Sequence, residues 1–71
     1  MPHSPEGLLC ACDAAKREGK DFPTVWSTVL RPHPLVIGLP THRVEHGEAQ
    51  IVVKLSTGQA LISSKSGYAL V

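Results

Sequence analysis

The stretch AQIVVKLSTGQALISSKSGYALV, residues 49–71, decides the fold of this 71-residue chain. Near its start the apolar residues Ile51, Val53 and Leu55 recur at every second position. Side chains alternate between the two faces of an extended strand, so these three residues share one face. Val52 and Lys54 then lie on the opposite face. The pattern predicts a strand over about residues 49–55.

Two tight turns are predicted further along the same stretch. The tetrapeptides STGQ at 56–59 and KSGY at 65–68 both contain a Ser or Thr followed by Gly. Glycine readily adopts the positive φ that a tight hairpin needs. The turns therefore divide the stretch into a three-stranded antiparallel meander, with strands over about 49–55, 60–65 and 68–71.

A first helix is predicted before the meander, over about residues 5–18. Ser4, Pro5 and Glu6 form a typical helix start. Serine caps the free amides, proline fits the first turn, and an acid is favoured at the positive end of the helix dipole. Gly19 is a typical C-terminal stop.

A second helix is predicted over about residues 22–31, after a start signal at Asp21. Its apolar residues follow the i, i+3, i+4, i+7 spacing of a buried helix face. These residues are Phe22, Val25, Trp26, Val29 and Leu30. Pro32 ends the helix because it lacks an amide donor and disfavours helix in the residue before it.

The remaining segment, residues 32–48, is predicted to be irregular because proline and glycine interrupt it repeatedly. Within it, residues 41–46 alternate in polarity, which would add a fourth strand. The sequence thus predicts one small α+β domain over residues 1–71. Two N-terminal helices pack on a C-terminal antiparallel meander of three strands, or of four if residues 41–46 join it.

The charge balance disfavours one class of function. Seven Lys and Arg against six Asp and Glu leave a net charge of +1, whereas nucleic-acid binders depend on neutralising many phosphates. Residues 49–71 carry two lysines and no acid, which is a small basic tilt. A helix pair followed by a hairpin is also compatible with a winged-helix-like nucleic-acid binder. That reading, using the hairpin and its basic residues, is kept as the alternative.

The expected location is the cytoplasm. The longest apolar run, at residues 35–39, is far shorter than a membrane span, and the N-terminus lacks the pattern of a signal peptide. Cys10 and Cys12 cannot supply the dense disulfide framework of a small secreted domain.

No catalytic, cofactor-binding or metal-ligating residues are predicted, and the protein is not expected to be an enzyme. The sequence lacks a G-x-S-x-G motif and a phosphate-binding glycine loop. Cys10 and Cys12 with His42 and His46 resemble zinc ligands, but the cysteines are too close together in sequence. On a strand the two histidines would lie ~13 Å apart, too far for one ion.

An interaction surface on the sheet is the favoured hypothesis. Apolar residues occur on both faces of the meander, so Val52, Leu61 and Val71 are expected in an exposed patch. The last strand, residues 68–71, carries no charge or proline to blunt it as a sheet edge. Two lysines would set orientation and association rate. The predicted partner-binding residues are Val52, Lys54, Leu61, Lys65, Tyr68, Leu70 and Val71.

A narrow stability margin supports the same hypothesis. Burial on folding contributes ~100 kcal/mol for a chain of this mass, and ordering it costs about the same. The chain is therefore expected to be a small non-enzymatic protein–protein interaction module. It would act as a regulator or inhibitor that docks on and occludes a larger protein assembly, or as a homodimeric module. A modulator from a phage or mobile element would fit this size.

Overall fold

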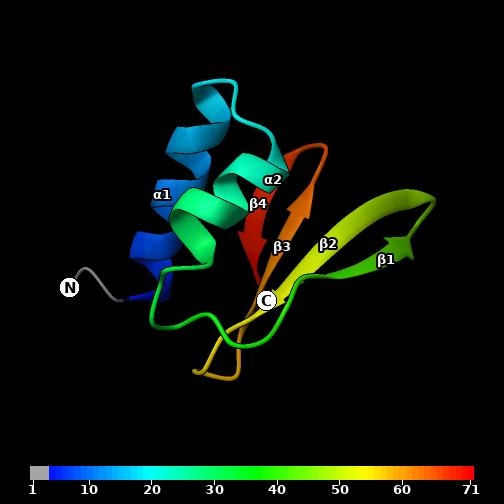
Figure 1. Ribbon diagram of the computed structural model, residues 1–71. Helices are drawn as coiled ribbons and strands as arrows, with labels where there is room; N and C mark the ends of the chain where they lie inside the picture. The colour runs from blue at the N-terminus through cyan, green and yellow to red at the C-terminus, as the bar shows by residue number, and fades with distance from the viewer. Residues whose placement is uncertain (1–3) are drawn as a thin grey trace.

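A computed structural model describes residues 4–71, and its elements follow the predicted order. Two helical segments precede a four-stranded sheet (Figure 1). The helical elements are α1 (Pro5–Arg17), α2 (Phe22–Val25) and η1 (Trp26–Leu30). The second helical segment, called the second helix, consists of α2 followed directly by η1. The strands are β1 (Thr41–Glu45), β2 (Glu48–Lys54), β3 (Ala60–Ser64) and β4 (Gly67–Leu70).

The sheet is an antiparallel meander with strand order β1-β2-β3-β4. The α+β class and the packing of N-terminal helices on a C-terminal meander are confirmed. The sheet takes the four-stranded form, because residues 41–45, within the segment expected to be irregular, pair with β2. An isolated bridge between Val36 and Leu55 extends the same edge.

Helix α1 forms as its start and stop signals predict. The Ser4 hydroxyl accepts a hydrogen bond from the Gly7 amide at 3.1 Å, which satisfies one of the free amides at the helix start. Gly19 follows the helix with a φ of +85°, a conformation that costs glycine little. The helix ends one residue earlier than predicted, which is a normal difference at a frayed end.

The second helix differs from the prediction in its second half. Residues 22–25 are α-helical, but η1 is a π-helix in which the Arg31 amide donates to the Trp26 carbonyl at 2.7 Å. The wider π turn rotates each residue by less, so residues five apart come round to the same side. Val25 and Leu30 are five apart and both fully buried. The π turn thus directs both side chains into the core.

The core lies between the helices and one face of the sheet. Its buried members come from α1, from the second helix and from the sheet. They are Leu8, Cys12, Ala15, Val25, Leu30, Val53, Leu55 and Leu61. The predicted alternation on β2 is confirmed, because Val53 and Leu55 are buried whereas Lys54 is exposed.

Leu61 corrects the predicted exposed patch. It is directly opposite Val53 and Leu70 in the sheet, and residues opposite each other share a face. That face packs against the helices, and Leu61 is 1% exposed. The side chain of its neighbour Ile62 lies on the outer face of the sheet. Ile62 is also buried, at 6% exposed, but it is not a member of the core cluster between the sheet and the helices.

The helices cover only part of the sheet. Helix α1 packs against β4, and both helical segments lie at that side of the molecule (Figure 1). The hairpin of β1 and β2 extends away from them (Figure 1). All five residues of β1 are exposed. The folded chain has 4526 Å² of accessible surface, close to the ~4,300 Å² expected for its mass.

The position of Leu61 leads to a stability prediction. Leu61→Ala should lower the free energy of unfolding by about 2–5 kcal/mol, or unfold the protein outright, because it leaves a cavity in the core. Val71→Ala, at a residue that is 69% exposed, should change it by less than about 0.5 kcal/mol. Urea denaturation followed by circular dichroism measures both. Equal effects would contradict the placement of Leu61.

Candidate protein-interaction surface

Strand β1 is an unpaired edge whose backbone groups are free to bond. In an antiparallel sheet, successive residues direct their amide and carbonyl alternately to the two sides of the strand. The Leu55 amide donates to the Gln59 carbonyl, and Ala60 and Val71 form a hydrogen-bonded pair. Following the alternation from these bonds through the register of β3, β2 and β1 shows to which side each residue of β1 directs its backbone groups. The amides and carbonyls of His42 and Val44 therefore point away from β2, along the open edge.

Exposed apolar side chains are concentrated along this edge. Among residues 4–71, four large hydrophobic side chains are exposed: Ile37, Leu39, Val44 and Val71. The first three fall within residues 37–44. Leu39 is 79% and Val44 74% exposed. We use the term β1 edge surface for these three residues together with His42 and Ala49: Ile37, Leu39, His42, Val44 and Ala49.

The face of the hairpin on the helix side is hollowed. His42 and Val44 lie opposite Ile51 and Ala49, so these four side chains share the face that packs on the helices elsewhere in the sheet. An open groove of about 380 Å³ follows this face and also contacts Ser63. None of the residues that line this groove belongs to a helix.

The outer face of β1 carries a fixed pair of opposite charges. Arg43 Nη2 lies 2.8 Å from Glu45 Oε2, and Arg43 Nε donates to Gln50 Oε1 at 2.9 Å. Each partner is half exposed, so the ion pair itself contributes little to stability. It does hold the guanidinium group in one orientation at the edge of the sheet.

Strand β4 forms the opposite edge of the sheet, as predicted for the last strand. This edge differs from β1 because α1 packs against it. A Cβ added at Gly67 would lie only 3.9 Å from the Lys16 side chain. Helix α1 and its Lys16 side chain therefore lie beside β4 near Gly67, whereas the helices make few or no contacts with β1.

The predicted partner-binding residues divide between two faces. Leu61, Tyr68 and Leu70 belong to the face that packs on the helices, where Leu61 is buried and the other two are half buried. Burial is the main cause that raises the pKa of Tyr68, with a Ser63 hydrogen bond acting in the opposite direction. These three residues are not part of an exposed patch.

The other four predicted residues lie on the outer face or in a turn. Register places Val52, Lys54 and Val71 on the outer face, where Val52 is half buried and the other two are exposed. Lys65 lies in the β3–β4 turn, and its amide donates to Glu48 Oε1 at 3.2 Å. The structure does not bring all seven residues together on one surface.

The cysteines and histidines are also separated. Cys10 is exposed and Cys12 is buried on α1, whereas His42 and His46 belong to the distant hairpin. In residues 4–71, no group of three or more His, Cys, Asp or Glu side chains is placed to hold a metal ion. Burial raises the pKa of the Cys12 thiol to about 12, with a smaller contribution from Asp13. The Cys12 thiol is thus neutral at physiological pH.

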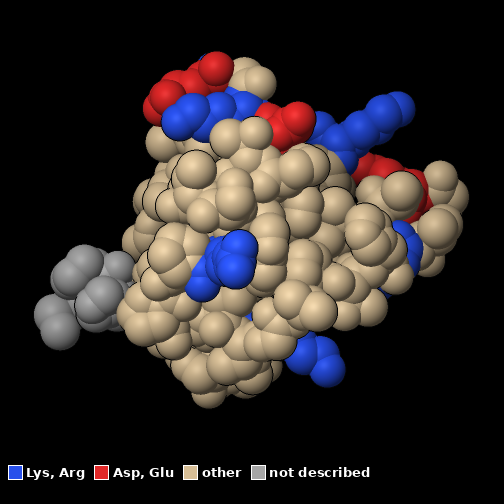
Figure 2. All heavy atoms as spheres, in the orientation of Figure 1, with Lys and Arg blue, Asp and Glu red and all other residues tan. Residues whose placement is uncertain are grey.

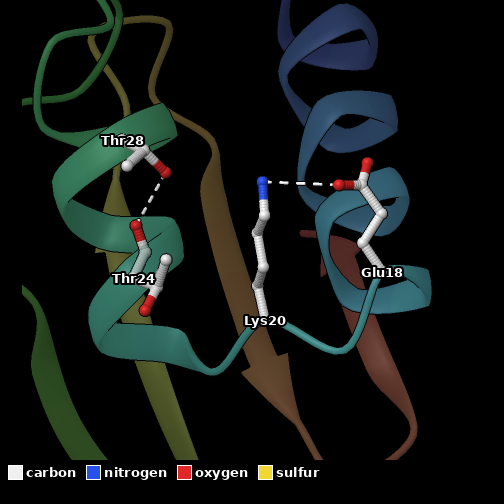
Figure 3. A network of polar contacts seen from close by, with 4 residues as sticks. All are labelled: Glu18, Lys20, Thr24 and Thr28. Atoms are coloured by element: carbon white, nitrogen blue, oxygen red, sulfur yellow. Dashed lines mark hydrogen bonds and ion pairs between the residues drawn. The ribbon is translucent and has the colours of Figure 1, made fainter.

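Basic side chains are interspersed with acidic ones. Figure 2 shows both signs of charge along the upper rim of the molecule, and below it a largely uncharged face that carries a few isolated basic groups. Lys20 reaches back to Glu18 at 3.4 Å, and the Thr28 hydroxyl donates to the Thr24 carbonyl at 2.7 Å (Figure 3). The exposed hydroxyl groups of Ser27 and Thr28 on the second helix therefore donate to carbonyls of the same helix.

Sequence reasoning missed the β1 edge surface, although one signal was present. His46 and Gly47 have φ of +53° and +74°, the conformation of a two-residue hairpin turn. Glycine at the second position is typical of this turn, and histidine is among the residues that adopt positive φ more often than most. Reading His46-Gly47 as a turn would have paired residues 41–45 with 48–52.

Comparison with known proteins adds no relationship. No protein-family model, curated protein or solved structure matches the chain. Within residues 4–71, no helix combines the length and apolar character needed to cross a membrane.

The two cysteines should differ sharply in reactivity. At pH 8 a thiol reagent such as Ellman's reagent should label Cys10 quickly and leave Cys12 unlabelled until urea unfolds the chain, because Cys12 is buried and protonated. Cys10→Ser should abolish the fast phase, and Cys12→Ser should retain it. Two fast equivalents in the native protein would place Cys12 outside the core.

Proposed function

We propose that this chain is a small non-enzymatic interaction module that binds another polypeptide along the free edge of β1. One observation carries the proposal: three of the four exposed large hydrophobic side chains among residues 4–71 lie along that edge. Large apolar side chains that remain exposed near one sheet edge of a small domain indicate an interaction site at that edge.

Strand addition is the mode of binding that fits this surface. The outward amides and carbonyls of His42 and Val44 are positioned to bond with a second extended chain. In such complexes the main-chain bonds contribute affinity, and side-chain pockets contribute specificity. The groove beside Val44 supplies a place for the apolar side chains of the partner.

The edge is limited in length by features at both ends. Gly38, with a φ of +71°, and Pro40 interrupt the pairing before β1, and the turn at His46 and Gly47 ends it. Proline and bulges are common devices that prevent indefinite strand addition. The surface therefore suits one defined partner segment rather than an open-ended assembly.

The proposal covers both forms of the sequence-based hypothesis. Docking on a larger protein assembly and self-association each need a free surface, and β1 offers one. Contacts at Val52, Lys54 and Val71 stay a prediction for the outer face of the sheet. Val71→Lys, added to the binding measurement described next, tests that prediction: it should bind the partner more weakly than the Thr57→Lys control does, and equal binding by the two would remove Val71 from the interface.

Val44→Lys should weaken partner binding by at least about tenfold, because it places a charge at the centre of an apolar contact. Stability should be unchanged, since Val44 is 74% exposed. Thr57→Lys adds the same charge in the exposed β2–β3 turn and serves as the matched control. Tagged wild type and variants are purified from cells of the source organism, and binding of the co-purified protein, or of the chain to itself, is measured by surface plasmon resonance. Equal binding by both lysine variants would place the interface elsewhere.

A further inference from the structure

We propose that the strand added to β1 is β1 of a second copy of this chain, so that two four-stranded sheets join into one continuous sheet. This inference rests on the proposed function and names its partner. A twofold axis between two edge strands makes them antiparallel and brings the same surface of each copy together. The contact therefore requires that β1 be complementary to itself.

The charges of β1 are self-complementary in one register. With Val44 opposite Val44 of the second copy, Arg43 lies opposite Glu45 of the second copy, and Glu45 opposite its Arg43. Opposite charges directly across an antiparallel pair stabilise it, and like charges destabilise it. A register centred on Arg43 would place two guanidinium groups against each other. A register centred on His42, whose backbone groups also point outward, would place Arg43 opposite Thr41 and leave the charges without opposite partners across the axis.

The direction of the backbone amides and carbonyls of β1 is compatible with this register. The amide and carbonyl of Val44 both point outward, so two Val44 residues facing each other exchange two hydrogen bonds across the axis. Arg43 is already oriented by Gln50 and Glu45 at 2.9 and 2.8 Å. Pre-ordered side chains lose less entropy on binding.

Apolar burial accompanies the pairing. The two Val44 side chains meet on the helix side of the joined sheet, above the groove that each hairpin leaves open. In this register the two strands overlap over residues 43–45, and Thr41 lies beside the hairpin turn of the second copy. Leu39, the most exposed of the large hydrophobic side chains in residues 4–71, is then brought to the hairpin turn of the other copy.

The contact closes as a dimer and does not propagate. Each copy uses its β1 edge once, and a twofold contact leaves no second β1 edge free. The remaining edge, β4, is flanked by α1 and by the Lys16 side chain near Gly67. The assembly therefore ends at two chains.

Charge-reversal variants test the contact between copies. In sedimentation equilibrium the wild type should approach twice the 7.6 kDa chain mass. Arg43→Glu and Glu45→Arg alone should each raise the dimer dissociation constant by at least about tenfold. An equimolar mixture of the two variants should restore it. Both variants break the Arg43–Glu45 pair within the chain, mixed or separate, so only a contact between copies explains the rescue.

A disulfide tests the register. Residues directly opposite in a hydrogen-bonded antiparallel pair have Cα atoms ~5.5 Å apart, which suits a disulfide. In a Cys10→Ser background, Val44→Cys should form a covalent dimer under mild oxidation, detected on a non-reducing gel. Thr57→Cys, which is also exposed but lies in the β2–β3 turn, should not.

Two results would overturn the inference: a wild type that stays monomeric up to ~1 mM, or a dimer unaffected by both charge reversals. Neither result decides the proposed function. If the wild type is monomeric, and Val44→Lys weakens its binding to a different protein whereas Thr57→Lys does not, the proposed function holds and the homodimer is wrong. If Val44→Lys binds that partner as the control does, the proposed function fails as well.

Discussion

The structure depends on one packed layer, in which the helices meet a single face of β2 and β3. Val53, Leu55 and Leu61 meet the apolar side chains of α1, α2 and η1 in one continuous cluster. Burial of these side chains is the main stabilising term available to so small a domain. The π turn of η1 is a consequence, because it brings Leu30 into the layer beside Val25.

The limited extent of that layer accounts for the exposed hairpin. The helical residues of the fold lie over the side of the sheet that holds β4, and β1 lies three strands away from it in the sheet order. The hairpin consequently keeps its apolar side chains and its outer backbone groups in contact with water. A sheet edge left in this state is a template for another strand unless something blunts it.

The two edges of the sheet therefore have different surroundings. At β4 the neighbouring helix restricts access, and the side chains of Tyr68 and Leu70 contribute to the core. At β1 the side chains contribute little to stability, so their apolar character and paired charges are free to serve recognition. Binding at β1 would also extend the buried area of a domain whose hydrophobic gain and ordering cost nearly cancel.

Local chemistry in the sequence determined the helices and three of the strands. Alternation along residues 49–55, glycine in the turns and the Ser4 and Asp21 caps act over a few residues, so they can be read without the fold. The tertiary structure decided which of the adjacent residues Leu61 and Ile62 faces the helices, and it removed Leu61 from the predicted interface. It also decided that residues 41–45 pair with β2 and lie beyond the helices. These outcomes depend on how far a short helical layer extends across a sheet, a distance set by packing between segments far apart in the chain.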